Sequence, residues 1–376
     1  MLHDNDSGRH LPAGEQQRAP RVRKRLLPTL GDARNSIRDA LRAAGLAPGG
    51  EQPPLILVAC SGGPDSLALA KAASFFARRG DYRVGAVVVD HGLQDGSAEV
   101  ADRARAACEA MGLDPVLVRR VCVPASGMGP EAAARTARYG ALDAAAAELG
   151  ASAVLLGHTL DDQAEQVLLG LMRGSGTRSL AGMPAVRGIY LRPFLGLRRE
   201  QTLEICAHAG LDPWHDPSNR DPAYARSRVR TEVLPFLEEK LGPGIAEALF
   251  RSSRILSADA DYLDAAAART FEELRTDAPS AGGSGSADLL LPEAQLRDLA
   301  PALRQRVLAL AALALGGAQP SYERLAAVES LLRRTGSAGP VQLVGKVSVY
   351  RQPRGKSVHH GAASYGNLVF RKKSST

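Results

Sequence analysis

The chain has 376 residues, a formal net charge of +7 and 45% hydrophobic residues. This length suits two or more domains with well-buried cores. No apolar run reaches the roughly 20 residues of a membrane span, and the polar, basic N-terminus lacks the apolar core of a secretory signal. The four cysteines have no CxxC spacing, which indicates reduced thiols in a cytoplasmic protein rather than disulfides or zinc ligands. The positive charge points to a polyanionic partner.

The sequence divides into four segments. Residues 1–35 are polar and basic, and we expect a disordered extension there. Residues 36–242 alternate strand and helix patterns and are expected to form a nucleotide-binding catalytic domain. Residues 243–356 are expected to form a smaller, mainly helical domain that binds RNA, and residues 357–376 a flexible tail.

Apolar runs and helical periodicity define the expected elements of the catalytic domain. Strands are predicted at 54–60, 83–90, 115–122, 152–157 and 188–192, and helices at 65–79, 97–111, 131–149, 160–172 and 198–210. This alternation predicts an α/β fold with an open parallel sheet of about five strands and helices on both faces. Beyond it we expect a long helix at 244–277, a flexible loop at 279–286, two further helical stretches and a short strand pair near 341–351.

The most informative motif is the loop Ser61-Gly62-Gly63-Pro64-Asp65-Ser66, which follows a strand pattern and opens a helix. Such a turn presents backbone N–H groups and the positive end of a helix to an anion. Gly62 and Gly63 permit close approach of a ligand, and Pro64 suits the first helical turn. Asp65 is a candidate Mg²⁺ ligand, and the serine hydroxyls are candidate phosphate donors.

Three further clusters follow predicted strands, where an open α/β sheet binds its ligands. Asp90 and His91 either face a nucleotide or merely cap a strand. Arg135 and Arg138 share a helix face with Glu131, and they either grip phosphate or form a solvated face. The third cluster runs from Gly157 to Glu165.

His158, Asp162 and Glu165 converge on one face at a helix start. Asp162 is a second candidate Mg²⁺ ligand beside Asp65, His158 a candidate proton carrier, and Glu165 a candidate ammonium-binding group. An acidic turn that only complements the helix dipole is the alternative, and it does not account for His158 and Glu165.

These motifs together resemble the tRNA(Ile)-lysidine synthetase family of PP-loop ATP pyrophosphatases, over roughly residues 54–356. The further motifs that carry the resemblance are Arg173-Gly174-Ser175-Gly176, Gly182-Met183-Pro184, Arg192-Pro193-Phe194-Leu195, Asp216-Pro217-Ser218-Asn219 and Arg226-Ser227-Arg228-Val229-Arg230. The chain departs at Gln166, where many members have Thr, and at Ser227, where they often have Asn.

The resemblance implies a reaction in which ATP adenylylates O2 of the wobble cytidine of a CAU-anticodon tRNA(Ile), and an amine of free lysine then displaces AMP to give lysidine. It implies ATP and Mg²⁺ as cofactors and no DNA or membrane partner. The implied catalytic residues are Asp65, Arg135, His158, Asp162 and Glu165, and the implied metal ligands are Asp65 and Asp162. The implied ATP-binding residues are Ser61, Gly62, Gly63, Pro64, Asp65, Ser66, Asp90, His91 and Gly157. The implied tRNA-binding residues are Arg138, Arg173, Arg192, Asn219, Arg226, Arg228 and Arg230.

Two other functions compete with this interpretation. Another PP-loop tRNA-modifying enzyme, such as a 2-thiolating one, shares the loop but normally needs paired cysteines, which this sequence lacks. A catalytically silent tRNA-binding protein on the same scaffold is the second alternative. The presence of Asp65, His158, Asp162 and Glu165 argues against the loss of catalysis.

Overall fold

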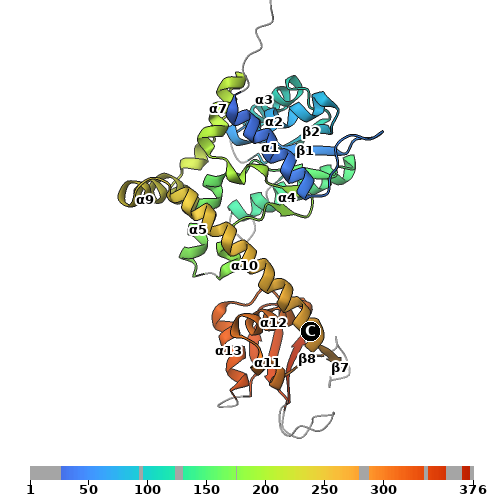
Figure 1. Ribbon diagram of the computed structural model, residues 1–376, viewed down its shortest axis with the longest axis vertical. Helices are drawn as coiled ribbons and strands as arrows, with labels where there is room; N and C mark the ends of the chain where they lie inside the picture. Colours follow the sequence, from blue (N-terminus) through green and yellow to red (C-terminus); the bar gives the residue numbers. More distant parts are fainter. Residues whose placement is uncertain are drawn as a thin grey trace, which may run out of the picture. The chain divides into compact units, whose positions relative to one another are not determined.

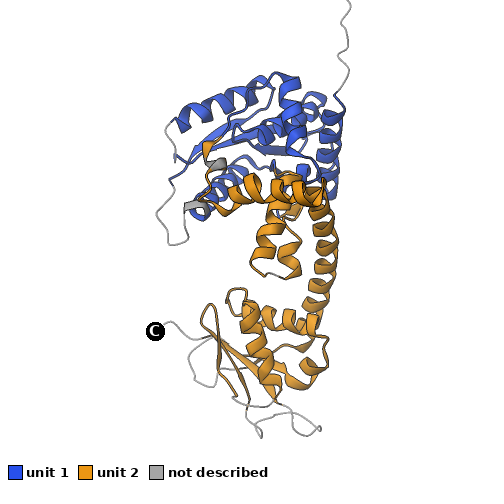
Figure 2. Cartoon of the chain, turned by 90° about the vertical axis from the view of Figure 1, so that its left-hand side faces the viewer, with its two compact units in different colours: residues 1–157, 188–215 blue, residues 158–187, 216–376 orange. Residues whose placement is uncertain are grey.

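The computed structural model describes residues 27–92, 96–122, 130–174, 176–278, 288–333, 338–352 and 366–372. The chain divides into two compact units, shown in blue and orange in Figure 2. The first contains residues 1–157 and 188–215, and the second contains residues 158–187 and 216–376. The division falls at Gly157, inside the region expected to form one catalytic domain.

The first unit is built on a parallel sheet. Strand β1 pairs with β2 and β4, β2 with β3, and β4 with β6, each time in parallel. The order is therefore β3-β2-β1-β4-β6, five of the six strands of this sheet. The strands are β1 Leu55–Ala59, β2 Arg83–Asp90, β3 Val116–Arg120, β4 Ala153–Leu155 and β6 Tyr190–Leu191. The helices are α1 Pro28–Ala43, α2 Pro64–Arg79, α3 Ser97–Ala110, α4 Pro130–Leu149, the 3₁₀ turn η1 Pro193–Gly196 and α7 Arg199–Ala209.

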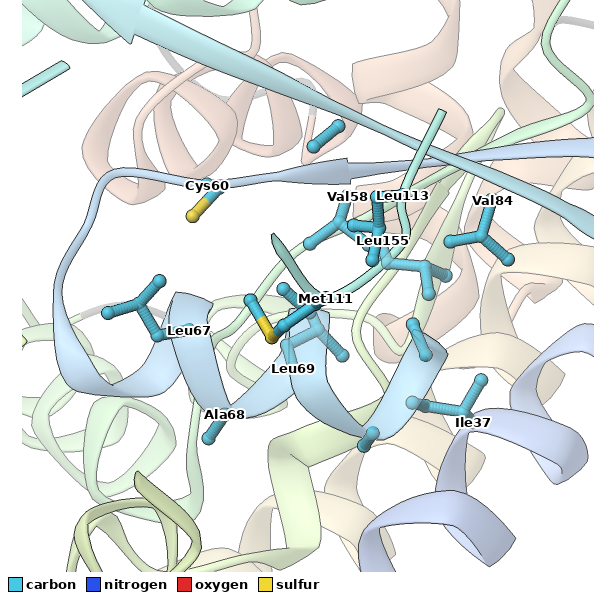
Figure 3. Close-up of a cluster of buried hydrophobic side chains, with 14 of the residues drawn as sticks. Ile37, Val58, Cys60, Leu67, Ala68, Leu69, Val84, Met111, Leu113 and Leu155 are labelled. Carbon is cyan, nitrogen blue, oxygen red and sulfur yellow. The ribbon is translucent and has the colours of Figure 1, made fainter. Parts of the chain in front are cut away.

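Alternate residues of the strands build two cores on opposite faces of this sheet. Ile56 and Val58 of β1 belong to a core with residues of α1, α2, α3 and α7, part of which Figure 3 shows. Leu55 and Leu57 belong to the other core, with Leu142 of α4. The predicted parallel sheet with helices on both faces is thereby confirmed.

Helix α1 corrects the predicted extent of the N-terminal extension. It begins at Pro28, and Leu30, Ala33, Ile37 and Leu41 are buried against the sheet core. The prediction of disorder is therefore wrong for residues 28–35, because an apolar stripe at helical spacing follows the proline. Residues 1–26 lie outside the described residues.

The second unit begins with α5 and contains the long helix α10, which packs against α5, α6 and α12 (Figure 1). Its first elements are α5 Leu160–Met172, α6 Thr177–Leu180, β5 Val186–Arg187, the 3₁₀ turn η2 Pro217–Arg220, α8 Ala225–Arg228, the π-helical turn η3 Val229–Val233 and α9 Leu234–Leu241. Its later helices are α10 Ile245–Leu274, α11 Glu293–Asp298, α12 Pro301–Ala314 and α13 Tyr322–Leu332.

The region after residue 243 is mainly helical, as predicted, and it also contains an antiparallel sheet that the sequence indicated only in part. Its strands β7 Thr276–Ala278, β8 Asp288–Pro292, β9 Val341–Leu343, β10 Val347–Arg351 and β11 Asn367–Lys372 lie in the order β7-β8-β11-β10-β9. The predicted pair near 341–351 is confirmed as β9 and β10. Strand β11 lies in the predicted flexible tail, yet Leu368 and Phe370 are fully buried in the core beneath the helices. The predicted loop at 279–286 lies outside the described residues.

Within the described ranges, the helices are all too short or too polar to cross a bilayer.

The close packing of β2 generates a test of the fold. A Cβ at Gly85 would lie 2.5 Å from the carbonyl oxygen of Pro115 and 3.0 Å from Cδ2 of Leu57. We expect Gly85→Ala to lower the free energy of unfolding by about 1–3 kcal/mol, because overpacking forces backbone shifts. Gly140→Ala is the matched control, since a Cβ there meets nothing within 4 Å in helix α4, and it should stabilise by about 0.5–1 kcal/mol. Urea denaturation measures both, and equal effects would contradict the packing argument.

Candidate active site

The loop between β1 and α2 has the backbone expected of an anion cradle. Gly62 adopts φ +79°, and Gly63 is the N-cap of α2, with Pro64 in the first turn. The hydroxyl of Ser66 donates to the Gly63 carbonyl (2.9 Å) and accepts from the Ser61 N–H (3.1 Å). Ser66 therefore shapes the loop from within, whereas Ser61 is exposed. The N–H groups of the first helical turn lie outside the helix's own ladder and point toward a bound anion.

Asp65 is held from helix α7, a contact that the sequence did not predict. The Thr202 hydroxyl lies 2.5 Å from Oδ1 of Asp65, and Nε of Arg199 lies 3.4 Å from Oδ2. Thr202 is fully buried, and the Asp65 side chain is 22% exposed. The Cys206 thiol donates to the Pro64 carbonyl (3.3 Å), and burial, with the nearby charge of Asp65, raises its pKa to about 11. Helix α7 thus fixes both the loop and its carboxylate.

Gly157, at the end of β4, touches the same helix start. A Cβ there would lie 3.0 Å from the carbonyl oxygen of Asp65 and 3.2 Å from the Ser66 nitrogen. Only a residue without a side chain allows this approach. The structure therefore brings the predicted Gly157 and Asp65 together.

Asp90 caps the end of β2. Its side chain is buried, accepts from the Gly92 N–H (3.0 Å) and lies 3.4 Å from Nε of Arg120 in the adjacent strand. The geometry matches the strand-capping alternative for Asp90. His91 is half-buried beside it.

Three predicted arginines converge around Tyr139 of α4. The Cζ atoms of Arg135 and Arg138 lie 5.1 and 5.9 Å from its ring centroid, and Nη2 of the buried Arg192 lies 3.4 Å from its hydroxyl. Burial raises the pKa of Tyr139, but these positive charges outweigh it and leave that pKa below its ordinary value. The three arginines thus form one electropositive cluster. The side chain of Glu131 lies outside the described ones.

In the second unit, Asp162 stabilises the start of α5. Thr159 is the N-cap, and Oδ2 of Asp162 accepts from its N–H (2.8 Å) and its hydroxyl (3.0 Å) in a capping box. Oδ1 of Asp162 lies 3.1 Å from Nη2 of Arg230. His158 is half-buried directly before the cap.

Glu165 is fully buried and bound by guanidinium groups. Arg230 donates to its two carboxylate oxygens at 2.6 and 2.9 Å, and Nε of Arg226 lies 3.6 Å away. Arg226 also donates to Oε1 of Gln166 (2.9 Å). Arg230 lies in the π-helical turn η3, a feature that often occurs at functional sites. The sequence analysis assigned Arg226 and Arg230 to RNA binding, and Asp162 and Glu165 to metal and ammonium binding. In the structure the two sets form ion pairs with each other.

The remaining predicted residues lie on the surface of the second unit. Arg173 follows α5, and Asn219 lies in η2. Both are exposed, as is Arg228, which donates to the carbonyls of Pro222 (2.5 Å) and Ala223 (3.1 Å).

The carboxylates differ in how well they suit a metal. In the part of the chain that the structure describes, three metal-ligating side chains do not gather at any one point. Asp65 is accessible and has oxygen ligands of the kind that Mg²⁺ prefers. Asp162 has both oxygens engaged by Thr159 and Arg230. Asp65 also has both oxygens engaged, by Thr202 and Arg199, but its side chain is 22% exposed against 11% for Asp162, and its arginine contact is longer, at 3.4 Å against 3.1 Å. Asp65 therefore fits a metal carried by a nucleotide better than Asp162 does, and each carboxylate would exchange its arginine contact for the metal.

The buried ion pair generates a stability test. Arg230→Met would remove the bidentate partner of the buried Glu165 and leave the contact with Arg226 at 3.6 Å. We expect a loss of about 3 kcal/mol in the free energy of unfolding, because an uncompensated buried carboxylate is costly. Arg228→Met is the matched control two residues away, and it should cost about 1 kcal/mol. Similar losses in both variants, measured by urea denaturation, would show that the pair does not stabilise the unit.

Family comparisons agree with the fold and the loop. Residues 35–237, more than half of the chain, match the model of the PP-loop domain. Residues 291–353 match the model of the TilS substrate binding domain.

Three relatives named tRNA(Ile)-lysidine synthase align over most of the chain. The protein of Leifsonia xyli subsp. xyli is 52% identical over 82% of this chain and 89% of its own length. That of Thermobifida fusca is 51% identical over 77% of this chain and 84% of its own. That of Streptomyces coelicolor is 49% identical over 81% of this chain and 85% of its own. The resemblance predicted from the motifs is confirmed: the chain belongs to the tRNA(Ile)-lysidine synthase family.

Proposed function

We propose that the chain uses ATP to join free L-lysine to C2 of the wobble cytidine in a CAU-anticodon tRNA(Ile), through an adenylylated cytidine. The observation that carries this proposal is the Ser61–Ser66 loop at the start of α2, in a chain that also matches the TilS substrate binding domain. The PP-loop domain supports ATP use, and the family supports tRNA as the substrate.

The proposed chemistry has two displacements. Cytidine O2 first bonds to the α-phosphorus of ATP, and the bond to the β-phosphate bridge breaks, so that pyrophosphate leaves. A deprotonated amine of lysine then bonds to C2, the bond from C2 to the AMP oxygen breaks, and the amine loses a further proton. Negative charge grows on the departing phosphates in the first displacement, so fixed positive groups near them lower the barrier.

The first unit offers groups for the phosphates. We assign the loop N–H groups, with Ser61 and Gly157, to phosphate binding, and the Arg135, Arg138 and Arg192 cluster to phosphate or RNA. Asp65 would hold Mg²⁺, which neutralises phosphate charge when bound. Ser66 and Asp90 would act indirectly, since their polar atoms shape the loop and the end of β2.

The second unit offers a charged cluster for the other substrates. We assign Asp162 and Glu165 to holding Arg226 and Arg230 in place. Direct binding of the lysine ammonium by Glu165 requires that Arg230 leave its carboxylate. His158, beside this cluster, is the proposed proton carrier. Exposed Arg173, Asn219 and Arg228 are proposed RNA contacts.

The location of the cysteines weighs against the thiolating alternative. Cys60, Cys108 and Cys206 are buried, and only Cys122 among the four is exposed. Burial and its neighbours raise the pKa of Cys206, which keeps that thiol protonated. A sulfur-transferring site needs accessible, reactive thiols.

The direct test is mass spectrometry of the nucleosides of tRNA(Ile) after incubation with the protein, ATP, Mg²⁺ and lysine. We expect lysidine at the wobble position, with AMP and pyrophosphate as products. Omitting lysine should leave the adenylylated cytidine or no product, and a tRNA with another anticodon should remain unmodified. A 2-thiolated nucleoside, or no change under any condition, would overturn the proposal.

The role of Asp65 is tested by Asp65→Asn, which keeps the shape of the side chain and removes its charge. We expect tRNA-dependent pyrophosphate release to fall by about 10²–10³-fold, as for removal of an electrostatic contact to a developing charge. Asp102→Asn in α3, at a 66% exposed side chain, should leave the rate unchanged. Full activity of Asp65→Asn across a Mg²⁺ titration would remove the assignment.

A further inference from the structure

A group of cations without carboxylate partners among the described residues lies on helices α1 and α2, and none of its members was assigned a role above. The two helices pack against each other in the first unit and are labelled in Figure 1. The group, here called the α1–α2 cation cluster, consists of Arg34 on α1 and Lys71 and Arg78 on α2. Lys71 and Arg78 are seven residues apart and therefore share one face of α2.

The cluster is partly removed from water. Arg34 and Lys71 are half-buried. The Arg34 guanidinium stacks on Phe75, with 4.3 Å from Cζ to the ring centroid. Its Nε is buried and has no hydrogen-bond partner among the described residues. Arg78 donates to the Ser74 hydroxyl (2.8 Å), a neutral group.

Acidic partners are missing from the cluster within the described part of the chain. Arg34, Lys71 and Arg78 interact electrostatically with one another rather than with a carboxylate. Burial and the neighbouring cations lower the pKa of both Arg34 and Lys71. Two other arginines of these helices do have carboxylate partners: Arg79 pairs with Asp81 at 3.0 Å, and Arg42 with Asp39 at 3.9 Å.

Such a cluster costs folding free energy, because like charges repel and partial burial weakens their hydration. An anion that binds between the helices would offset that cost. Arginine binds phosphate bidentately, and lysine binds it as a point charge. Lys71 and Arg78 leave α2 about 10 Å apart along its axis, so the charge spreads along a strip that suits successive phosphates better than a single one.

We propose that the α1–α2 cation cluster binds the phosphate backbone of the tRNA substrate. The inference deepens the proposed function, on which it rests for its ligand. The cluster is separate from the Arg135, Arg138 and Arg192 group, because α1 and α2 pack on one face of the sheet and α4 on the other. It therefore adds a contact that holds RNA without taking part in the chemistry.

The test replaces the three cations together, as Arg34→Gln, Lys71→Gln and Arg78→Gln, in the full chain. Binding of tRNA(Ile) is measured between about 50 and 200 mM salt. We expect at least about a tenfold loss of affinity at low salt and a log–log salt slope that is flatter by about 2, as expected for about three lost phosphate contacts. The loss should be equal for a tRNA with another anticodon, because phosphates carry no sequence information.

Two controls separate RNA binding from a structural role. Arg42→Gln, on the same helix but paired with Asp39 at the surface, should change neither affinity nor slope. The melting temperature of the triple variant should equal or exceed that of the wild type, since repulsion is relieved, and MgATP affinity should be unchanged. A lower melting temperature with an unchanged salt slope would overturn the proposal.

The remaining outcomes are equally decisive. If inorganic pyrophosphate raises the melting temperature of the wild type but not of the triple variant, and tRNA affinity stays the same, the cluster binds a small anion and the proposal is wrong. If the wild type makes no lysidine, yet tRNA affinity depends on the cluster, the proposed function fails and this inference stands.

Discussion

The structure depends on close backbone contact around the first turn of α2. Gly62 adopts a positive φ, and a Cβ added at Gly157 would lie 3.0–3.2 Å from backbone atoms of Asp65 and Ser66. A side chain at Gly157 would push the start of α2 away from the chain that follows β4, and one at Gly62 would be strained at its positive φ and would crowd Ala104 of α3. Because these contacts fix where α2 begins, they also fix the direction of its N–H groups and of Asp65. The positions of the charged groups in the first unit therefore depend on main-chain geometry together with the α7 side chains that hold Asp65.

In the second unit, the main constraint is the burial of a charged carboxylate. Glu165 is completely buried, and Arg230 satisfies both of its oxygens in a bidentate arrangement. Asp162 links the same guanidinium to the cap of α5. Removing one of these side chains would leave a buried charge without its ion-pair partner, so the contributions of the residues to stability are coupled. This arrangement gives a rigid support in which guanidinium groups are oriented before a substrate arrives.

Sequence reasoning found the local features and missed those set by distant contacts. The Ser61–Ser66 loop and the cap of α5 depend on neighbouring residues, so their patterns are readable. The contact of Thr202 with Asp65 joins residues 137 positions apart, and no local pattern encodes it. The pairing of Arg230 with Glu165 was hidden for the same reason. Strand β11 was missed because it ends in basic residues and gains its partners β8 and β10 only in the folded sheet.

Helix α1 has a practical consequence for where this protein can be shortened. The matched PP-loop model begins at residue 35, after the first two turns of the helix have already buried Leu30 and Ala33. A truncated protein that starts at this family boundary would lack those side chains and uncover the apolar core that they cover. Its loss of solubility would then reflect a boundary drawn through a packed helix, not a requirement for RNA or nucleotide. The N-terminal limit of the folded domain is set by its hydrophobic core, and that core includes residues from about Leu27 onward.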